Sequence, residues 1–358
     1  MVLIDVMDRL GEPWTLALGG GVIGMIFGAF AQQSRFCLRA ATVEFWRGSI
    51  GERTSVWLVV FLAAIAGTSL LSQTGAIVAH EARQIASPQS LSGAAIGGLM
   101  FGSGMILARG CASRLLVLAA TGNLRALLSG LVFAVVAQAS LYGILSPLRE
   151  AAARLLTKGA TGGNDILQMV GLDGGMALAL ASLAGLASIA LALWRGARPW
   201  AVFAAAAVGS TVPLAWWFTH AMSGLSFSPV QMNSITFTGP SASTLMVFLN
   251  GGATAVNFST GLVPGVFAGS FLAALLAGEL RLAGFEGGQS MKRYLAGAAL
   301  MGFGGMLAGG CAVGAGVTGA SVFALTAWVT LFAIWFAAGA TDRLIDRPPE
   351  MAALRQSA

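Results

Sequence analysis

The sequence has few charged residues. Asp, Glu, Lys and Arg together make up 9% of its 358 residues, whereas hydrophobic residues make up 56%. Soluble domains carry about a quarter charged residues, so this chain cannot cover a water-facing surface and is predicted to be an integral membrane protein. Several uncharged runs reach the roughly 20 residues that a helix needs to cross a bilayer, which favours helices over a β-barrel.

Cysteine and histidine are also scarce. The chain has three cysteines and two histidines, and no two cysteines form a CxxC pair. An odd number of isolated cysteines argues against a disulfide framework, and neither histidine has the spacing of a metal ligand. The sequence contains no nucleotide-binding motif either. We therefore expect no metal or other cofactor, and no direct use of ATP.

The basic residues lie in short segments between apolar runs. The formal net charge is +6. In a membrane protein, Lys and Arg in short loops set the orientation of the chain. We therefore expect the protein to contact membrane lipid and not to bind nucleic acid.

One glycine-rich stretch occurs twice. Gly97–Ser113 reads GGLMFGSGMILARGCAS, and a second copy at Gly297–Val313 reads GAALMGFGGMLAGGCAV, so that each position of the first copy has a counterpart in the second. Each copy is an apolar run that ends in Gly-Cys-Ala, at Gly110 and Cys111 or at Gly310 and Cys311, and a second apolar run follows. This pattern predicts a helix that breaks partway across the membrane with a thiol at the break. New helices are expected to begin near Ser113 and Gly316.

The apolar runs predict about nine transmembrane helices in an all-α membrane protein, and the two repeat copies are two of them. The other seven are 14–31, 56–71, 124–145, 176–194, 200–218, 262–280 and 322–339. Leu245–Phe258 is apolar but too short to cross, which suggests a re-entrant segment. Arg149–Asp173 is expected to be a polar loop or a surface helix.

The positive-inside rule places the N-terminus in the periplasm and the C-terminus in the cytoplasm of a bacterial inner membrane. With nine crossings the two copies run in opposite directions. The prediction is a single membrane domain over 1–358, with inverted-repeat halves 14–148 and 200–340 joined by 149–199. Broken helices of such repeats are expected to meet at the midplane, with their breaks facing each other.

The breaks suggest an anion site. A helix N-terminus has unpaired N–H groups and a partial positive charge, and Arg109 and Arg114 flank the first break. Both the arginines and the cysteines also have a simpler explanation. The arginines are ordinary loop charges if the break lies at the surface, and a cysteine in an apolar helix often only fills space.

The paired Gly-Cys-Ala segments and an upstream Ser-Arg-Phe-Cys-Leu-Arg at Ser34–Arg39 resemble the YeeE/YedE sulfur-transport family, from about Trp14 to Gly339. The resemblance implies an hourglass-like fold and uptake of thiosulfate along a path lined by Cys37, Cys111 and Cys311. It also implies small TusA-like sulfur-carrier proteins as partners, and some relatives are linked to selenium. The chain departs from the family in Ala312–Gly319, which is unusually apolar.

The hypothesis from the sequence is therefore a transporter of thiosulfate or a related sulfur anion, and not an enzyme. The predicted substrate-binding residues are Cys37, Cys111, Cys311, Arg109, Arg114, Gly110 and Gly310. A neutral thiol can donate a weak hydrogen bond to the terminal sulfur of thiosulfate, and helix ends can bind its oxygens. The alternatives are transport of a selenium species and a membrane-embedded thiol sulfurtransferase or oxidoreductase. That enzyme would need a thiol whose pKa is lowered, for example by Arg35 or Arg109.

Overall fold

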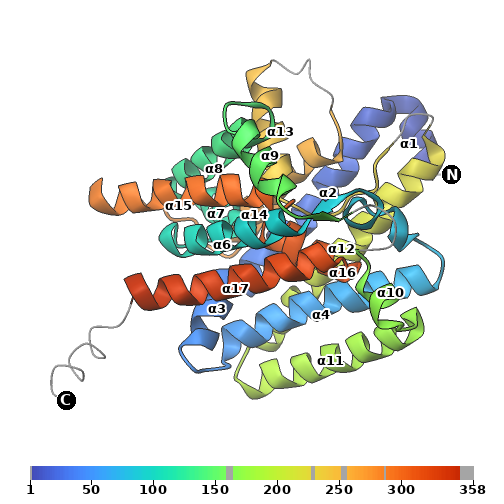
Figure 1. The fold of residues 1–358 in the computed structure, drawn as a ribbon, viewed down its shortest axis with the longest axis horizontal. Helices are drawn as coiled ribbons and strands as arrows, with labels where there is room; N and C mark the ends of the chain where they lie inside the picture. Colours follow the sequence, from blue (N-terminus) through green and yellow to red (C-terminus); the bar gives the residue numbers. More distant parts are fainter. Residues whose placement is uncertain (1, 159–163, 227–229, 251–255, 286–287, 347–358) are drawn as a thin grey trace.

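The computed structural model describes residues 2–158, 164–226, 230–250, 256–285 and 288–346 (Figure 1). Over these residues the protein is helical, apart from a small antiparallel pair of strands, β1 (Gln89–Ser90) and β2 (Thr157–Lys158). Within the described ranges eight helices are long and apolar enough to cross a membrane, or nine if one bent pair counts as a span. The protein is an all-helical, multi-pass membrane protein.

The helices form two series in the same order. The first series is α2 (Glu12–Ser34), α3 (Leu38–Trp46), α4 (Glu52–Gln73), α6 (Leu91–Leu107), α7 (Ala112–Ala120) and α8 (Leu124–Tyr142). The second is α12 (Pro199–Leu225), α13 (Thr238–Leu249), α14 (Phe258–Leu276), α15 (Gly288–Leu307), the π-helix η2 (Ala312–Thr318) with α16 (Gly319–Ser321), and α17 (Leu325–Ile345). Each series is a long helix, a short helix, a long helix, a broken helix and a final long helix.

Shorter elements precede, interrupt and join the two series. α1 (Val2–Leu10) comes first, and η1 (Ala79–Glu81) and α5 (Arg83–Ala86) lie between α4 and α6. α9 (Ser146–Arg154), α10 (Ile166–Val170) and the long α11 (Gly174–Trp194) connect the series. In Figure 1, α11 lies at the edge of the molecule beside α4.

Both repeat copies are broken at the predicted place. α6 ends at Leu107 and α15 at Leu307, and the residue two positions later is left-handed in each case, with φ of 54° at Arg109 and 78° at Gly309. A left-handed residue just beyond a helix ends it because the next N–H groups no longer point along the axis. Cys111 and Cys311 are the N-cap residues of the helices that follow.

The helix after the first break begins at Ala112, one residue before the predicted Ser113. The helix after the second break begins at Ala312, so the predicted start at Gly316 is wrong. There the chain forms a π-helix that is buried throughout. Glycine is a poor helix former and favours a later start, but this wider helix includes Gly314 and Gly316.

Glycines bring α6 and α15 into backbone contact. A Cβ added to Gly97 would lie 2.5 Å from the carbonyl oxygen of Gly304, and one added to Gly104 would lie 2.5 Å from that of Gly297. Early residues of one helix meet late residues of the other, so the two helices are antiparallel. Gly97 corresponds to Gly297 in the other repeat copy, and Gly304 corresponds to Gly104. The two contacts are therefore equivalent between the copies.

The neighbours of this pair repeat the relationship. A Cβ on Gly102 would lie 2.5 Å from the carbonyl oxygen of Ile334 in α17, and one on Gly302 would lie 2.7 Å from that of Phe133 in α8. Small residues let membrane helices approach closely enough for dispersion forces to hold them. The four helices α6, α8, α15 and α17 therefore pack as two matching pairs.

α2 and α14 pack side by side in parallel. Gly20 lies against Phe258, and Gly28 lies against Val266, so residue numbers rise together along both helices. This packing brings the C-terminal ends of α2 and α14 together. Gln32 donates a hydrogen bond of 2.8 Å to Glu279 at that end.

One predicted segment holds short helices and another needs correction. Arg149–Asp173, expected to be a polar loop or a surface helix, contains the end of α9 and all of α10. The polar stretch Gln32–Arg53 contains the helix α3. The predicted re-entrant segment Leu245–Phe258 is replaced in part by α13, which begins at Thr238, and residues 251–255 lie outside the described part of the chain. Apolar runs mark burial well, but they locate short helices poorly because a few turns can include polar residues.

Candidate functional site

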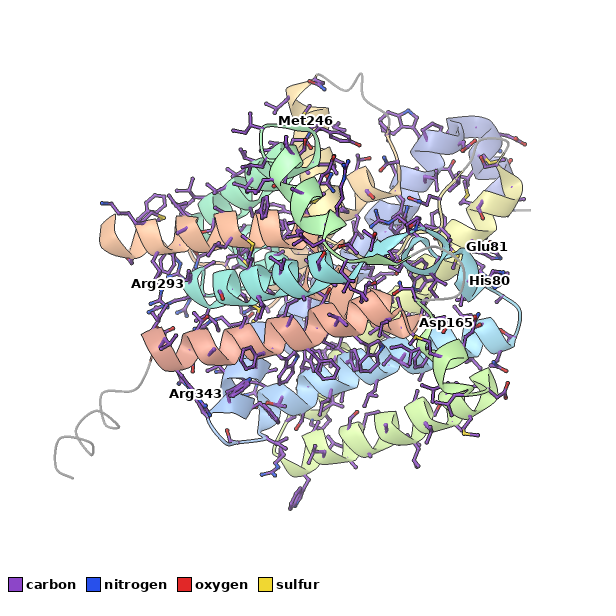
Figure 2. All side chains as sticks on the ribbon, in the orientation of Figure 1. His80, Glu81, Asp165, Met246, Arg293 and Arg343 are labelled. Atoms are coloured by element: carbon purple, nitrogen blue, oxygen red, sulfur yellow. The ribbon has the colours of Figure 1, made fainter. Side chains whose placement is uncertain are left out.

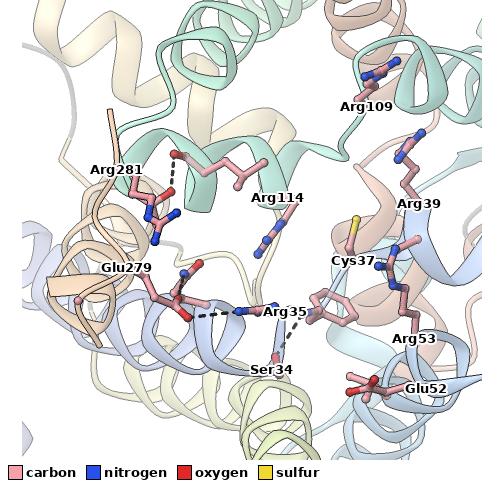
Figure 3. Close-up of a pocket in the computed structure, with 17 residues that line it drawn as sticks. Ser34, Arg35, Cys37, Arg39, Glu52, Arg53, Arg109, Arg114, Glu279 and Arg281 are labelled. Carbon is pink, nitrogen blue, oxygen red and sulfur yellow. Dashed lines mark hydrogen bonds and ion pairs between the residues drawn. The ribbon is translucent and has the colours of Figure 1, made fainter. Parts of the chain in front are cut away.

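A large cavity lies where the C-terminal ends of α2 and α14 meet the first helix break. Its volume is about 750 Å³. The lining comes from the end of α2, the start of α3, the start of α4, the break itself, the end of α7 and the residues after α14 (Figure 3). These segments are far apart in the sequence, and the helix packing brings them to one end of the molecule.

Arginine dominates the cavity wall. The cavity is lined by two glutamates, Glu52 and Glu279. It is also lined by six arginines: Arg35, Arg39, Arg53, Arg109, Arg114 and Arg281. Arg35 is paired with Glu279 at 3.3 Å. The excess of fixed positive charge in a concave site attracts anions.

Two of these guanidinium groups have buried donors without protein partners. Among the residues that the structure describes, neither Nη1 of Arg114 nor Nε of Arg39 has a hydrogen-bond acceptor. A buried donor without an acceptor is costly, so a site that leaves two of them beside a cavity is suited to a ligand that accepts hydrogen bonds. An oxyanion has that character.

Cys37 lies in the cavity wall. It is the N-cap residue of α3, and the left-handed Arg35, with φ of 51°, turns the chain from α2 into α3. Arg39 and Arg114 act electrostatically on Cys37, and Figure 3 shows its sulfur between these two arginines. The thiol therefore faces the most basic part of the cavity.

Cys111 is adjacent to Cys37. Its side chain is buried, at 1% exposure, and its Sγ lies 3.4 Å from Oγ of Ser113. The thiols of Cys37 and Cys111 are close enough to interact electrostatically. Two thiols thus follow one another from the cavity into the protein.

Cys311 occupies the second break. It is also 1% exposed, and its Sγ accepts a hydrogen bond of 3.4 Å from the backbone N–H of Gly314. Gly310 is buried beside it, and a Cβ there would lie 2.7 Å from the backbone nitrogen of Ala315. The second thiol site is therefore enclosed by the backbone of the π-helix.

The two breaks are staggered along the α6–α15 contact. A Cβ on Gly297 would lie 2.5 Å from the nitrogen of Ala108, and one on Gly97 would lie 2.6 Å from that of Ala308. Residues 297 and 308 are separated by roughly 16 Å along a helix at 1.5 Å per residue. The broken helices are in contact, but their breaks do not face each other, which corrects the expectation from the sequence.

The stagger divides the predicted site residues between two places. Five of them gather at the first break and its cavity, namely Cys37, Cys111, Arg109, Arg114 and the buried Gly110. Cys311 and Gly310 lie at the second break. The predicted residues therefore form two groups along the molecule.

Arg109 is held at the cavity rim by its strained backbone and an aromatic ring. Its guanidinium lies 5.9 Å from the centroid of the Tyr294 ring in α15. Tyr294 is buried, and Arg125 lies over the same ring at 4.7 Å. A cation over an aromatic face is stabilised by the ring quadrupole, so this contact helps to orient Arg109.

An ion-pair network surrounds the cavity on the side of α3. Asp342 of α17 accepts two hydrogen bonds of 3.0 Å from Arg47, and Asp342 raises the pKa of Arg47 through them. Asp346 is paired with Arg293 at 2.9 Å and with Arg39 at 3.6 Å. The network ties α3 to α15 and α17, which belong to the second series.

The sequence alone does not assign Arg39, Arg53 and Arg281 to a site. They lie in or next to short polar segments, where arginine is an ordinary orientation signal. The available signal is the density of arginine in Gln32–Arg53, together with the basic stretch that begins at Arg281. Among the described residues, no group of three His, Cys, Asp or Glu side chains is placed to hold a metal ion.

An all-helical multi-pass membrane protein with an arginine-lined cavity and adjoining thiols belongs among the membrane proteins that handle small anions. Comparison with protein families narrows this class. The model of the family described as sulphur transport matches residues 33–340, and the chain belongs to that family. The match includes Cys37, Cys111 and Cys311, and it confirms the resemblance found in the sequence.

Two curated relatives match over nearly their whole length. The chain is 26% identical over 340 residues to the thiosulfate transporter TsuA of Escherichia coli (strain K12), which covers 89% of this chain and 91% of the relative. It is 27% identical over 348 residues to the thiosulfate transporter TsuA of Spirochaeta thermophila, which covers 91% of this chain and 96% of the relative.

Proposed function

We propose that this protein takes up thiosulfate across the bacterial inner membrane along a path that includes Cys311, Cys111 and Cys37. The observation that carries the proposal is the arginine-lined cavity, with Cys37 in its wall and the thiol of Cys111 close enough to interact with it. Membership of the sulphur transport family and the two full-length relatives named thiosulfate transporters support it.

The chemistry of the cavity suits thiosulfate. The dianion carries sulfonate oxygens that accept hydrogen bonds and a soft terminal sulfur. The free donors of Arg39 and Arg114 can bind the oxygens. A neutral thiol such as that of Cys111 can donate weakly to the sulfur without adding negative charge. Weak contacts at successive thiols would let the anion leave again, as conduction requires.

The two helix series are proposed to be inverted repeats, 14–148 and 200–340, within one membrane domain. Their support is the reciprocal contacts of Gly97 with Gly304 and of Gly104 with Gly297, which become equivalent when the two repeat copies are exchanged. Antiparallel packing of equivalent helices is what a pseudo-two-fold axis in the membrane plane produces.

We place the cavity at the cytoplasmic side, the N-terminus in the periplasm and the C-terminus in the cytoplasm. Figure 2 shows Arg293 and Arg343 at one end of the long helices, and His80 and Glu81 at the opposite end. Arg293 is linked through Asp346 to Arg39 of the cavity, so the cavity shares the basic end. Basic residues at the ends of transmembrane helices favour the cytoplasm.

A sulfur-carrier protein of the TusA type is a suitable partner at the cytoplasmic mouth. The family resemblance suggests it, and the wide cavity would let a carrier thiol approach an anion held beside Cys37. The carrier would receive thiosulfate after passage, and this chain would act as a transporter rather than an enzyme.

Uptake into cells tests the function. Cells without their own thiosulfate and sulfate importers should take up ³⁵S-labelled thiosulfate only when they express this protein. Equal uptake by cells with the empty vector would contradict the proposal. Labelled selenite in parallel separates sulfur transport from selenium transport.

A further inference from the structure

The two helix breaks differ in one side chain at the same position. The left-handed residue is Arg109 at the first break and its counterpart Gly309 at the second. Arg109 lines the cavity, whereas glycine offers no charge there. Arginine is replaced by glycine at a second position too, because the counterpart of Arg114 in the second copy is Gly314. The second break therefore has no arginine of its own.

Another segment supplies a guanidinium to the second break. Arg83 begins the short helix α5, which lies between α4 and α6 in the chain. Its Nη2 donates a hydrogen bond of 3.4 Å to the carbonyl oxygen of Gly309. The guanidinium thus lies at the left-handed residue of the second break, as the Arg109 side chain does at the first.

The segment that carries Arg83 is fixed in place. The carbonyl oxygen of Arg83 accepts hydrogen bonds from Ser87, at 2.6 Å, and from Gln89, at 3.1 Å. Ala82 and Ile85, on either side, are buried. The backbone at Arg83 is therefore ordered, and the side chain is restrained by its hydrogen bond to Gly309.

The charges near Arg83 leave it available. Arg83 is the only Lys or Arg between Arg53 and Arg109, so no other such cation in that stretch can serve this end of the protein. The nearby acid Glu81 lies 3.6 Å from His220. Arg83 donates to a neutral carbonyl, and a guanidinium has five N–H donors, so further donors remain for an oxyanion.

We propose that Arg83 is an anion-binding residue at the second break, where it takes the role that Arg109 has at the first. The proposal rests on the proposed function and adds a residue to it: in the orientation given above, Arg83 makes the first charged contact with thiosulfate on the periplasmic side, ahead of Cys311. A small dianionic oxyanion binds to the guanidinium beside Gly309 and then passes to the thiol.

The structure offers a rescue design. A Cβ added to Gly309 would meet nothing within 4 Å, and its φ of 78° is close to the 54° that Arg109 adopts. Gly309→Arg therefore places an arginine at the second break in the way the chain already does at the first. If Arg83 binds the anion, this arginine replaces it. If Arg83 only caps the carbonyl of Gly309, it does not.

The experiment measures initial rates of thiosulfate uptake in proteoliposomes against thiosulfate concentration. Arg83→Gln should raise KM about tenfold with little change in maximal rate, which is the size expected for one charge-assisted hydrogen bond. Arg83→Lys should lie between, and Arg83→Gln/Gly309→Arg should return KM to within about threefold of wild type. Arg154→Gln is the control. Arg154 lies on α9 and is 79% exposed, and the end of α9 packs against the start of α6 near the second break.

Each result has a defined meaning. A wild-type KM in Arg83→Gln, a fall in maximal rate alone, or no rescue by Gly309→Arg would overturn the role of Arg83 while wild-type uptake upholds the proposed function. No uptake by the wild type would reject the function itself. If Arg83→Gln does not accumulate in the membrane, Gly309→Arg alone decides: it should lower KM, and an unchanged KM would overturn the proposal.

Discussion

Gly97 of α6 and Gly304 of α15 are in backbone contact, and the same contact recurs between Gly297 and Gly104. The pair fixes how the two broken helices lie against each other, and it sets the stagger between the two thiol-bearing breaks. A side chain at any of the four positions would have to displace backbone, which cannot yield as the end of a flexible side chain can.

Gly97→Ala and Gly304→Ala should therefore each destabilise the protein. The added Cβ would lie within 2.7 Å of backbone atoms of the partner helix, and overpacking of this kind costs about 1–3 kcal/mol. The midpoint of thermal unfolding in detergent should fall by several degrees. Gly130→Ala in α8 is the matched control, because a Cβ there meets nothing within 4 Å. Equal midpoints for all three variants would contradict the tight contact.

Asp342 should be important for stability because it is buried and charged. Its side chain is 4% exposed and accepts both hydrogen bonds from Arg47, which is 45% exposed. Asp342→Asn should cost about 1–2 kcal/mol, a reduced value because Arg47 is partly solvated. Thermal unfolding measures the loss. Asp5→Asn breaks an exposed pair with Arg9, with side chains 65% and 77% exposed, and should change nothing; similar losses for both would contradict the account.

The two breaks could be located from the sequence because Gly-Cys-Ala recurs at matching positions of the two copies, next to glycine-rich apolar runs. The cavity could not, because Arg35 and Arg281 come together only through the parallel packing of α2 and α14. The π-helix escapes prediction for a similar reason. The low intrinsic helix propensity of Gly314 and Gly316 predicts a break in the helix. The contact of Gly314 with Thr236, which belongs to a distant segment, is not visible in the local sequence.

The orientation can be measured with reporters. A reporter fused after Arg355 should read cytoplasmic, and one inserted directly after Leu225, where α12 ends, should read periplasmic. The reverse pattern would place the arginine cavity at the periplasmic face. In that case the cavity would serve entry, and the roles assigned to the two breaks would exchange.

The three cysteines should each matter for transport. Serine keeps nearly the size and a hydrogen-bond donor but pairs poorly with a soft sulfur. Cys37→Ser, Cys111→Ser and Cys311→Ser should therefore insert normally and import several-fold more slowly, with Cys111 most affected because Arg109 and Arg114 flank it. Uptake is normalised to protein in the membrane. Wild-type rates in all three variants would leave the thiols as packing residues.

The most direct measurement of the central claim uses purified protein in proteoliposomes and thiosulfate labelled at the terminal sulfur. The account predicts that intact labelled thiosulfate accumulates inside the vesicles, that Cys111→Ser slows its entry several-fold, and that mass spectrometry finds no lasting persulfide on Cys37, Cys111 or Cys311. Release of sulfite with label left on a cysteine would show a sulfurtransferase instead, and vesicles that stay empty would contradict transport by this protein.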